Sequence, residues 1–120
     1  MNINKMIRVA SMSTHSRYQH CSIIFAGSRL LTYGYNHGEV HAEIMAINRL
    51  EALIRNHMRR PRNLHMINFM IKRKTGKIGN SIPCDGCYLA SMNAGIKTIT
   101  FINSAGKPVQ LGGIFGLGEW

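Results

Sequence analysis

The sequence has few acidic residues, few cysteines and no long apolar run. Asp and Glu number 5 against 15 Lys and Arg, which gives a formal net charge of +10 at pH 7. Three cysteines cannot all pair with one another, so a fully paired disulfide framework is excluded. No apolar run reaches the roughly 18 residues of a membrane span, and the N-terminus lacks the pattern of a signal peptide. We therefore expect a soluble, cytoplasmic protein in a reducing compartment.

The excess of positive charge favours a polyanionic partner. Lys and Arg side chains that neutralise phosphates supply much of the affinity of proteins for nucleic acids. A basic surface can also serve solubility alone, and the net charge does not decide between these two interpretations. The position of the basic residues relative to a functional site has to decide.

The alternation of apolar and turn residues predicts helices interspersed with strands in one domain, which we place over residues 1–120. The expected elements are a helix over 4–14, strands over 21–26 and 30–35, a helix over 40–58, a strand over 64–71, a helix from Pro83 to near Gly95, and strands over 97–102 and 109–111. The turn over 103–108 is too short for a parallel crossover, which needs about a dozen residues or more. The last strand must therefore run antiparallel to the one before it.

Two short motifs contain residue types that bind and use zinc. His41 and Glu43 stand at the start of one predicted helix, and Cys84 and Cys87 follow Pro83 at the start of another. Zinc prefers tetrahedral sites of nitrogen and sulfur, and three protein ligands leave the fourth position open for water, as in catalytic sites. The metal lowers the pKa of that water from about 15.7 towards neutrality. We interpret His41, Cys84 and Cys87 as a candidate catalytic zinc site.

The cysteine pair alone also fits half of a zinc ribbon or a redox motif. A ribbon needs a second pair, and the remaining cysteine, Cys21, falls in an apolar strand where a small buried hydrophobe is expected. A thioredoxin-like motif follows the first strand of its unit, whereas this pair follows three predicted strands. A zincin helix needs Glu directly after its first His, but Gly38 follows His37. Four histidines show no partner spacing and are assigned no chemistry: His15, His20, His57 and His65.

The segment His41-Ala42-Glu43, followed after a predicted strand by Pro83-Cys84-Asp85-Gly86-Cys87, resembles the H-x-E and P-C-x-x-C signature of the zinc deaminases. The resemblance to the cytidine deaminase-like superfamily covers about residues 18–103. It implies an α/β fold, a three-layer α-β-α sandwich whose mixed sheet of four to five strands has helices on both faces. It also implies a Zn²⁺ cofactor, and a Glu that moves protons from the zinc water to the ring nitrogen and then to the leaving amine. Glu43 takes that role by position.

The resemblance further implies contacts to the substrate. Asn36, at the end of a predicted strand, resembles an asparagine that holds the sugar or base in several members, although Asn is also a common turn residue. The backbone N–H of Ala42 is expected to bind the base carbonyl. The direction of the preceding strand places the loop over 72–82 beside the zinc, so we expect its basic residues to bind phosphate: Lys72, Arg73, Lys74 and Lys77. A second basic group lies at the far end of its helix, where cations suit the helix dipole: Arg55, Arg59, Arg60 and Arg62.

Two departures bear on the substrate. Free-cytidine deaminases commonly have Cys where this chain has His41, whereas deoxycytidylate, tRNA-adenosine and polynucleotide cytosine deaminases have His. The deoxycytidylate and tRNA types insert a helix between the fourth and fifth strands, for which the turn over 103–108 is too short. The chain thus resembles the branch that ends in a β-hairpin, which includes nucleoside deaminases, RNA- and DNA-editing domains and toxins.

We therefore predict a zinc-dependent hydrolytic deaminase that converts cytosine to uracil in a nucleotide or a single-stranded polynucleotide, DNA or RNA. The alternatives are a free cytidine or deoxycytidine deaminase, an adenosine-type deaminase, and an inactive zinc-bearing nucleic-acid-binding module. Glu43 argues against the inactive module, because a purely structural metal site has no use for an acid/base group. The sequence leaves the number of subunits, and so a homo-oligomer, open.

Overall fold

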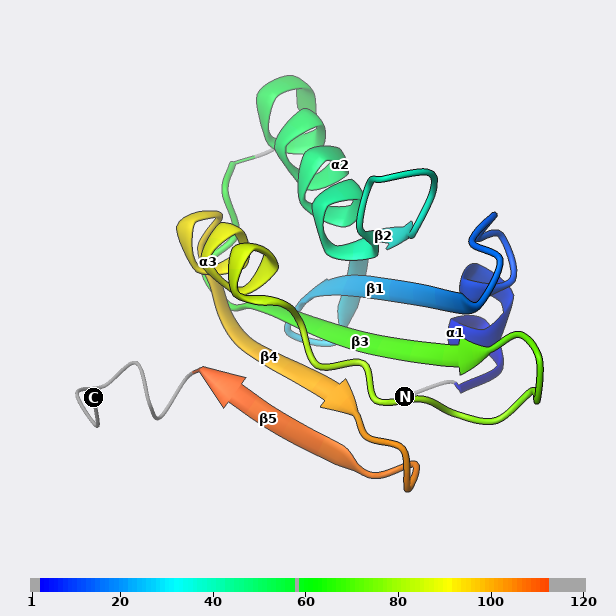
Figure 1. Ribbon diagram of the computed structural model, residues 1–120. Helices are drawn as coiled ribbons and strands as arrows, with labels where there is room; N and C mark the ends of the chain where they lie inside the picture. Colours follow the sequence, from blue (N-terminus) through cyan, green and yellow to red (C-terminus); the bar gives the residue numbers. More distant parts are fainter. Residues whose placement is uncertain (1–2, 58, 113–120) are drawn as a thin grey trace.

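Five strands form one mixed sheet in the order β2-β1-β3-β4-β5 (Figure 1). The computed structural model describes residues 3–57 and 59–112. The elements are α1 (Ile3–Ala10), β1 (Tyr18–Ala26), β2 (Arg29–Tyr35), α2 (Ala42–His57), β3 (Leu64–Lys72), α3 (Asp85–Asn93), β4 (Ile96–Ile102) and β5 (Pro108–Gly112). β3 and β4 are parallel and the other neighbouring pairs are antiparallel. The expectation that the fifth strand runs antiparallel to the fourth is confirmed.

Helices cover both faces of the sheet, and each face has its own apolar core. α2 and α3 lie over one face, where Ile24, Leu50 and Met66 belong to one buried cluster. α1 lies on the other face, where Ile23 and Phe69 belong to a second cluster. Successive strand residues point to opposite faces, which is why Ile23 and Ile24 contribute to different cores. The predicted three-layer α-β-α sandwich is confirmed. No helix within residues 3–57 and 59–112 is long and apolar enough to span a membrane.

Several helix boundaries differ from those that the sequence predicts. α2 begins at Ala42 rather than at residue 40, and its predicted end at residue 58 lies outside the described residues. α1 ends at Ala10, because the next residues bond back by three-residue turns, with Ser13 N–H donating to the carbonyl of Ala10 at 3.0 Å. α3 does not begin at Pro83. Cys84 is the N-cap of this helix, with extended φ −69° and ψ 166°, and its Sγ accepts a hydrogen bond from the N–H of Cys87. A residue with that backbone cannot continue a helix from Pro83, so the proline stands before the cap rather than inside the first turn.

β2 lies so close to α2 that one position accepts only glycine. A Cβ at Gly34 would clash with the carbonyl oxygen of Ala42 and the amide nitrogen of Ala46, and backbone atoms cannot rotate away. Gly34→Ala should therefore lower the free energy of unfolding by about 1–3 kcal/mol or more, measured by urea denaturation. Gly86→Ala is the matched control in α3, because nothing lies within 4 Å of its added Cβ, and it should change stability by less than about 1 kcal/mol. Equal midpoints for the two variants would contradict this close approach.

Candidate metal centre and active site

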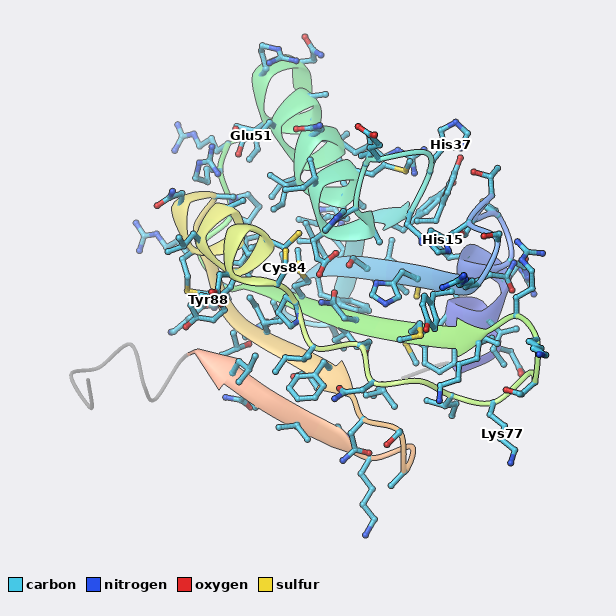
Figure 2. All side chains as sticks on the ribbon, viewed as in Figure 1. His15, His37, Glu51, Lys77, Cys84 and Tyr88 are labelled. Carbon is cyan, nitrogen blue, oxygen red and sulfur yellow. The ribbon has the colours of Figure 1, made fainter. Side chains whose placement is uncertain are left out.

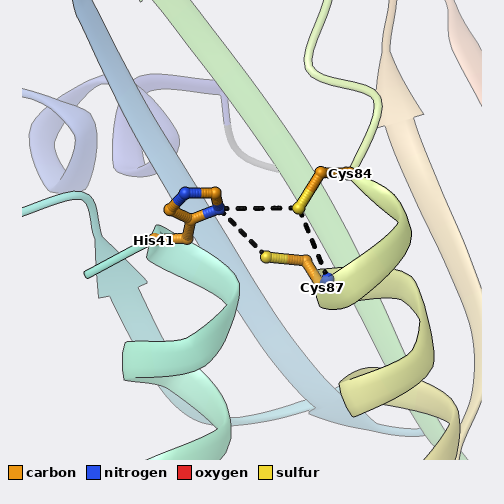
Figure 3. A group of neighbouring side chains, drawn as sticks. All are labelled: His41, Cys84 and Cys87. Carbon is orange, nitrogen blue, oxygen red and sulfur yellow. Dashed lines mark hydrogen bonds between the residues drawn. The ribbon is translucent and has the colours of Figure 1, made fainter. Parts of the chain in front are cut away.

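Three metal-binding side chains converge where α2 and α3 begin (Figure 3). Nδ1 of His41 lies 3.1 Å from Sγ of Cys87 and 3.7 Å from Sγ of Cys84. The ligand atoms of the three residues all lie within 4.8 Å of one another, and no other group of three or more His, Cys, Asp or Glu in the described part of the chain gathers in this way. The structure thus brings together the three residues that the sequence analysis selected as zinc ligands.

The local backbone fixes each of these side chains at a helix start. The carbonyl of His41 accepts the N–H of Met45 at 3.1 Å, so His41 stands directly before the first turn of α2. Cys84 caps α3, and Cys87 lies in its first turn. The arrangement of one imidazole and two thiols at two helix starts is suited to a tetrahedral zinc ion.

The electrostatics of Cys87 fit a bound cation. Burial raises the pKa of the Cys87 thiol, and the nearby carboxyl of Glu43 and thiol of Cys84 raise it further. An anionic sulfur at this depth is therefore unfavourable on its own. A divalent cation reverses the balance, because a coordinating thiol is deprotonated outright. The donor set thus fits zinc, with His41, Cys84 and Cys87 as the residues that would hold it.

Glu43 lies in the first turn of α2 and is 2% exposed. Its Oε2 accepts a hydrogen bond from Nδ2 of Asn68 at 3.2 Å, whereas its buried Oε1 has no hydrogen-bond partner within the described residues. Burial raises the pKa of the Glu43 carboxyl, and its neighbours, including His41 and Asn68, only partly offset this. A buried acceptor without a partner costs about 1–3 kcal/mol. Oε1 therefore fits a place where water or substrate binds.

A cavity of about 240 Å³ adjoins His41 at the start of β1. Its lining includes His15, Tyr18, His20 and Asn36. Burial, with the nearby imidazoles of His41 and His15, lowers the pKa of His20 to about 4, so His20 is neutral near pH 7. The sequence analysis assigned His15 and His20 no chemistry. The alternation of side chains along a strand could have indicated part of this cavity, because Tyr18 and His20 lie on the face of β1 that points towards α2.

A second cavity of about 470 Å³ is lined by the metal-binding group itself. Its lining includes Ile44, Gly86 and the three ligand residues His41, Cys84 and Cys87. Glu39, Val40 and His41 line both cavities. The candidate metal centre therefore adjoins two cavities. The rest of the first lining includes imidazole, phenol and amide groups, and the rest of the second consists of Ile44, Gly86 and the cysteines.

Two further residues expected to bind the substrate, Asn36 and Ala42, lie near the candidate metal centre. Asn36 lines the smaller cavity, but its Nδ2 donates to the carbonyl of Tyr18 at 2.8 Å and its Oδ1 accepts the N–H of His20 at 2.9 Å. The amide thus extends the pairing of β1 with β2. Ala42 is the first residue of α2 and is 1% exposed. The first N–H groups of a helix have no partner inside the helix, so that of Ala42 is suited to bind an acceptor.

The basic loop residues do not lie beside the metal centre. Lys72, Arg73, Lys74 and Lys77 are all exposed, and none of them lines either cavity that adjoins His41. Figure 2 shows Lys77 well apart from Cys84, beyond the end of β3. The loop folds back along β3, because the N–H of Lys72 donates to the carbonyl of Lys77 at 2.8 Å and that of Gly79 to the carbonyl of Met70 at 2.9 Å. Only the end of the loop, at the cysteines, reaches the centre.

Arg73 instead anchors the segment that precedes β1. Its Nε donates to the carbonyl of His15 at 3.0 Å and its Nη2 to the carbonyl of Ser13 at 2.9 Å. The basic loop is thereby joined to the wall of the smaller cavity. Arg60 of the distal basic group binds the carbonyl of Ala94, at the end of α3 opposite the cysteines, and the carboxylate of Glu51 in the interior of α2.

No protein-family model and no curated protein matches the chain. Solved structures do. The dCMP deaminase of the cyanophage S-TIM5, in its apo form, superposes with a TM-score of 0.62 at 15% identity, over 84% of this chain and 79% of that chain. The cytidine deaminase of Burkholderia pseudomallei superposes with a TM-score of 0.61 at 15% identity, over 94% of each chain. The chain therefore has the fold of the cytidine and dCMP deaminases, as its two motifs predict.

Proposed function

We propose that the protein is a zinc-dependent hydrolytic deaminase that converts cytosine to uracil in a nucleotide or a single-stranded polynucleotide. The observation that carries this proposal is the unpartnered, buried Oε1 of Glu43 beside the group of His41, Cys84 and Cys87. A metal site that only stabilises a fold has no use for such an oxygen. The fold shared with two solved deaminases supports the same reaction.

The residues of this chain divide the chemistry among them. His41, Cys84 and Cys87 would hold zinc, which when bound would lower the pKa of a water molecule and so supply a nucleophile near neutral pH. Glu43 takes one proton of the attacking water at Oε1 and gives it to the ring nitrogen of the base, and then takes the second proton from the same water oxygen and gives it to the leaving amine. Water and cytosine thus yield uracil and ammonia. The N–H of Ala42 binds the base carbonyl.

The smaller cavity is the proposed place of the base. The ring of Tyr18, whose residue is 43% exposed, stacks on that of His15 with centroids 5.8 Å apart, and aromatic faces bind bases by stacking. The neutral imidazole of His20 and the amide of Asn36 offer hydrogen bonds there. A strand that leaves the cavity past the segment held by Arg73 meets the exposed cations of the basic loop.

A free nucleoside, cytidine or deoxycytidine, is the second candidate substrate. One observation favours it: none of the four basic loop residues lines the two cavities at His41, so the site itself offers no Lys or Arg to a phosphate on the reacting nucleotide. The net charge of +10 favours the polynucleotide.

The test of the function is a substrate panel. Zinc-loaded protein is incubated with cytidine, dCMP, and single-stranded DNA and RNA that each carry one cytosine, and uracil is measured by mass spectrometry. We expect uracil in a phosphate-bearing substrate. Uracil from cytidine alone would select the second candidate, and no deamination of any member would contradict a cytosine deaminase.

The basic loop gives a prediction about how a strand binds. The triple variant Lys72→Gln, Lys74→Gln and Lys77→Gln should weaken binding of a single-stranded oligonucleotide and flatten its salt dependence. Each lost phosphate contact removes about 0.7 from the slope of log affinity against log salt. Arg73 is retained because its side chain holds backbone carbonyls. Fluorescence anisotropy across a salt series provides the measurement.

A variant with the same loss of charge on the distal surface is the control. Arg55→Gln, Arg59→Gln and Arg62→Gln remove the same number of positive charges from exposed residues near the C-terminal end of α2, and leave the bonded Arg60 in place. We expect a smaller loss of affinity. Equal losses would show that net charge alone drives association, and no loss from either triple variant would favour the free nucleoside.

A further inference from the structure

Three buried polar side chains, those of Ser22, Asn68 and Glu43, form a hydrogen-bonded row between the sheet and α2. Ser22 on β1 and Asn68 on β3 are direct cross-strand partners, and both point to the face that α2 covers. Ser22 and Asn68 are 0% and 1% exposed, and Glu43, at the end of the row, is 2% exposed. An Asn in the middle of a buried strand is unfavourable by strand propensity and by desolvation. Its presence among Met66, Phe69 and other apolar residues of β3 therefore requires a reason.

Each hydrogen bond of this row is donated towards Glu43. Oγ of Ser22 donates to Oδ1 of Asn68 at 2.6 Å, and Nδ2 of Asn68 donates to Oε2 of Glu43 at 3.2 Å. The amide presents its nitrogen to the carboxyl of Glu43. Its oxygen faces β1, where the hydroxyl of Ser22 donates to it. Rotating the amide by half a turn would replace the N–H···O bond to Glu43 with a contact between two oxygens. The hydroxyl of Ser22 can donate or accept, so its bond restrains the position of the amide, while the contact with Glu43 sets its orientation.

The hydrogen-bonded row gives the two carboxyl oxygens of Glu43 different surroundings. Oε2 is occupied by Asn68, which leaves Oε1 as the buried oxygen without a partner. We infer that Asn68, hydrogen-bonded to Ser22, is a positioning residue that holds the carboxylate of Glu43 at Oε2 and leaves Oε1 free to face water and base. This inference rests on the proposed deaminase function. A reacting group that is displaced by about 1 Å can lose about 10²-fold in rate, so a lost positioning bond should act mainly on kcat.

Ser81 offers a matched control. It is 0% exposed, and its Oγ bonds to the backbone carbonyls of Asn68 and Ile102 at 3.0 and 2.8 Å. Ser81 thus holds the same strand through buried hydrogen bonds, and its hydrogen bonds within the described residues do not include Glu43. A purely structural role of Ser22 and Asn68 predicts that Ser81→Ala and Ser22→Ala behave alike in catalysis.

The experiment compares Asn68→Leu, Ser22→Ala and Ser81→Ala in the zinc-loaded protein. We expect kcat to fall about 10²-fold in Asn68→Leu, and less in Ser22→Ala, with KM within about 3-fold of the wild type. Ser81→Ala should lower thermal stability and leave kcat within about 2-fold. All three variants should keep one zinc per chain, because none of these residues belongs to the metal-binding group. A kcat near the wild-type value in both Asn68→Leu and Ser22→Ala, with activity in the wild type, would overturn the inference and leave the proposed function standing.

A second readout does not depend on activity. The side-chain NH₂ signals of Asn68 in a ¹⁵N NMR spectrum, assigned by their loss in Asn68→Asp, should shift in Glu43→Gln and in Ser22→Ala but not in Ser81→Ala. Absence of turnover in the wild type would overturn the proposed function, and the NMR signals would still decide whether Asn68 holds Glu43. If the side-chain NH₂ signals of Asn68 do not shift in Glu43→Gln, the positioning role is overturned. This readout decides the question even if Asn68→Leu fails to fold.

Discussion

Glu43→Gln is expected to lower turnover of the cytosine substrate by about 10²–10⁴-fold while zinc content and fold are retained. The amide of Gln cannot take the proton of the attacking water, because its oxygen is far less basic than a carboxylate. Glu43 is not part of the metal-binding group, so the ligands are unchanged. The side chain keeps its size, which leaves the packing of α2 intact. Turnover, zinc by elemental analysis and thermal unfolding measure the three properties.

A matched control separates this role from a general loss of charge. Glu51→Gln removes the same charge from the same helix, at a residue whose carboxylate pairs with Arg60 at 2.8 Å on the surface. Exposed ion pairs contribute about 0–1 kcal/mol, so this variant should keep its turnover and nearly all of its stability. Near-normal turnover in Glu43→Gln would show that another group moves the protons.

The metal-binding group could be predicted from the sequence because each of its motifs is short. Cys84 and Cys87, three residues apart, share a face at the start of one helix, and His41 and Glu43 stand at the start of the other. Once the two helices form, only one long-range contact, between their two starts, is needed to bring the three ligand residues together. The shared fold follows in the same way from apolar periodicity, which indicates the faces of strands and helices without knowledge of their pairing. Cys21 is also buried as expected, at 1% exposure.

The supporting residues could not be predicted, because they depend on register between distant strands. Ser22 and Asn68 are 46 positions apart, and their contact exists only when β1 and β3 pair in one register. A shift of β3 by one residue relative to β1 would turn Asn68 to the other face of the sheet. The placement of Lys77 failed for a related reason: the direction of β3 is correct, but the loop after it returns along the strand before it reaches Cys84. Strand direction alone does not give the path of a loop.

Loss of the cysteines is expected to remove zinc completely. The double variant Cys84→Ala and Cys87→Ala should contain no zinc and no deaminase activity, whereas the wild type should contain one zinc per chain, as the one metal-binding group within residues 3–57 and 59–112 predicts. A single imidazole from His41 does not hold the ion against a chelator. Cys21→Ala is the matched control, because burial raises the pKa of the Cys21 thiol to about 12 and that thiol lies in the core under α1. Zinc content by elemental analysis distinguishes the variants.

The same variants test whether zinc binding is coupled to the stability of the fold. A ligand that binds only the native state stabilises it by mass action, so a chelator should lower the Tm of the wild type by several degrees. The double cysteine variant should not respond to the chelator, and Cys21→Ala should respond as the wild type does. Zinc uptake should also release protons, because the raised pKa of the Cys87 thiol keeps it protonated until the metal arrives. Full zinc content in the double variant would place the metal elsewhere in the chain, and Glu43 would then lose the water on which its proposed role depends.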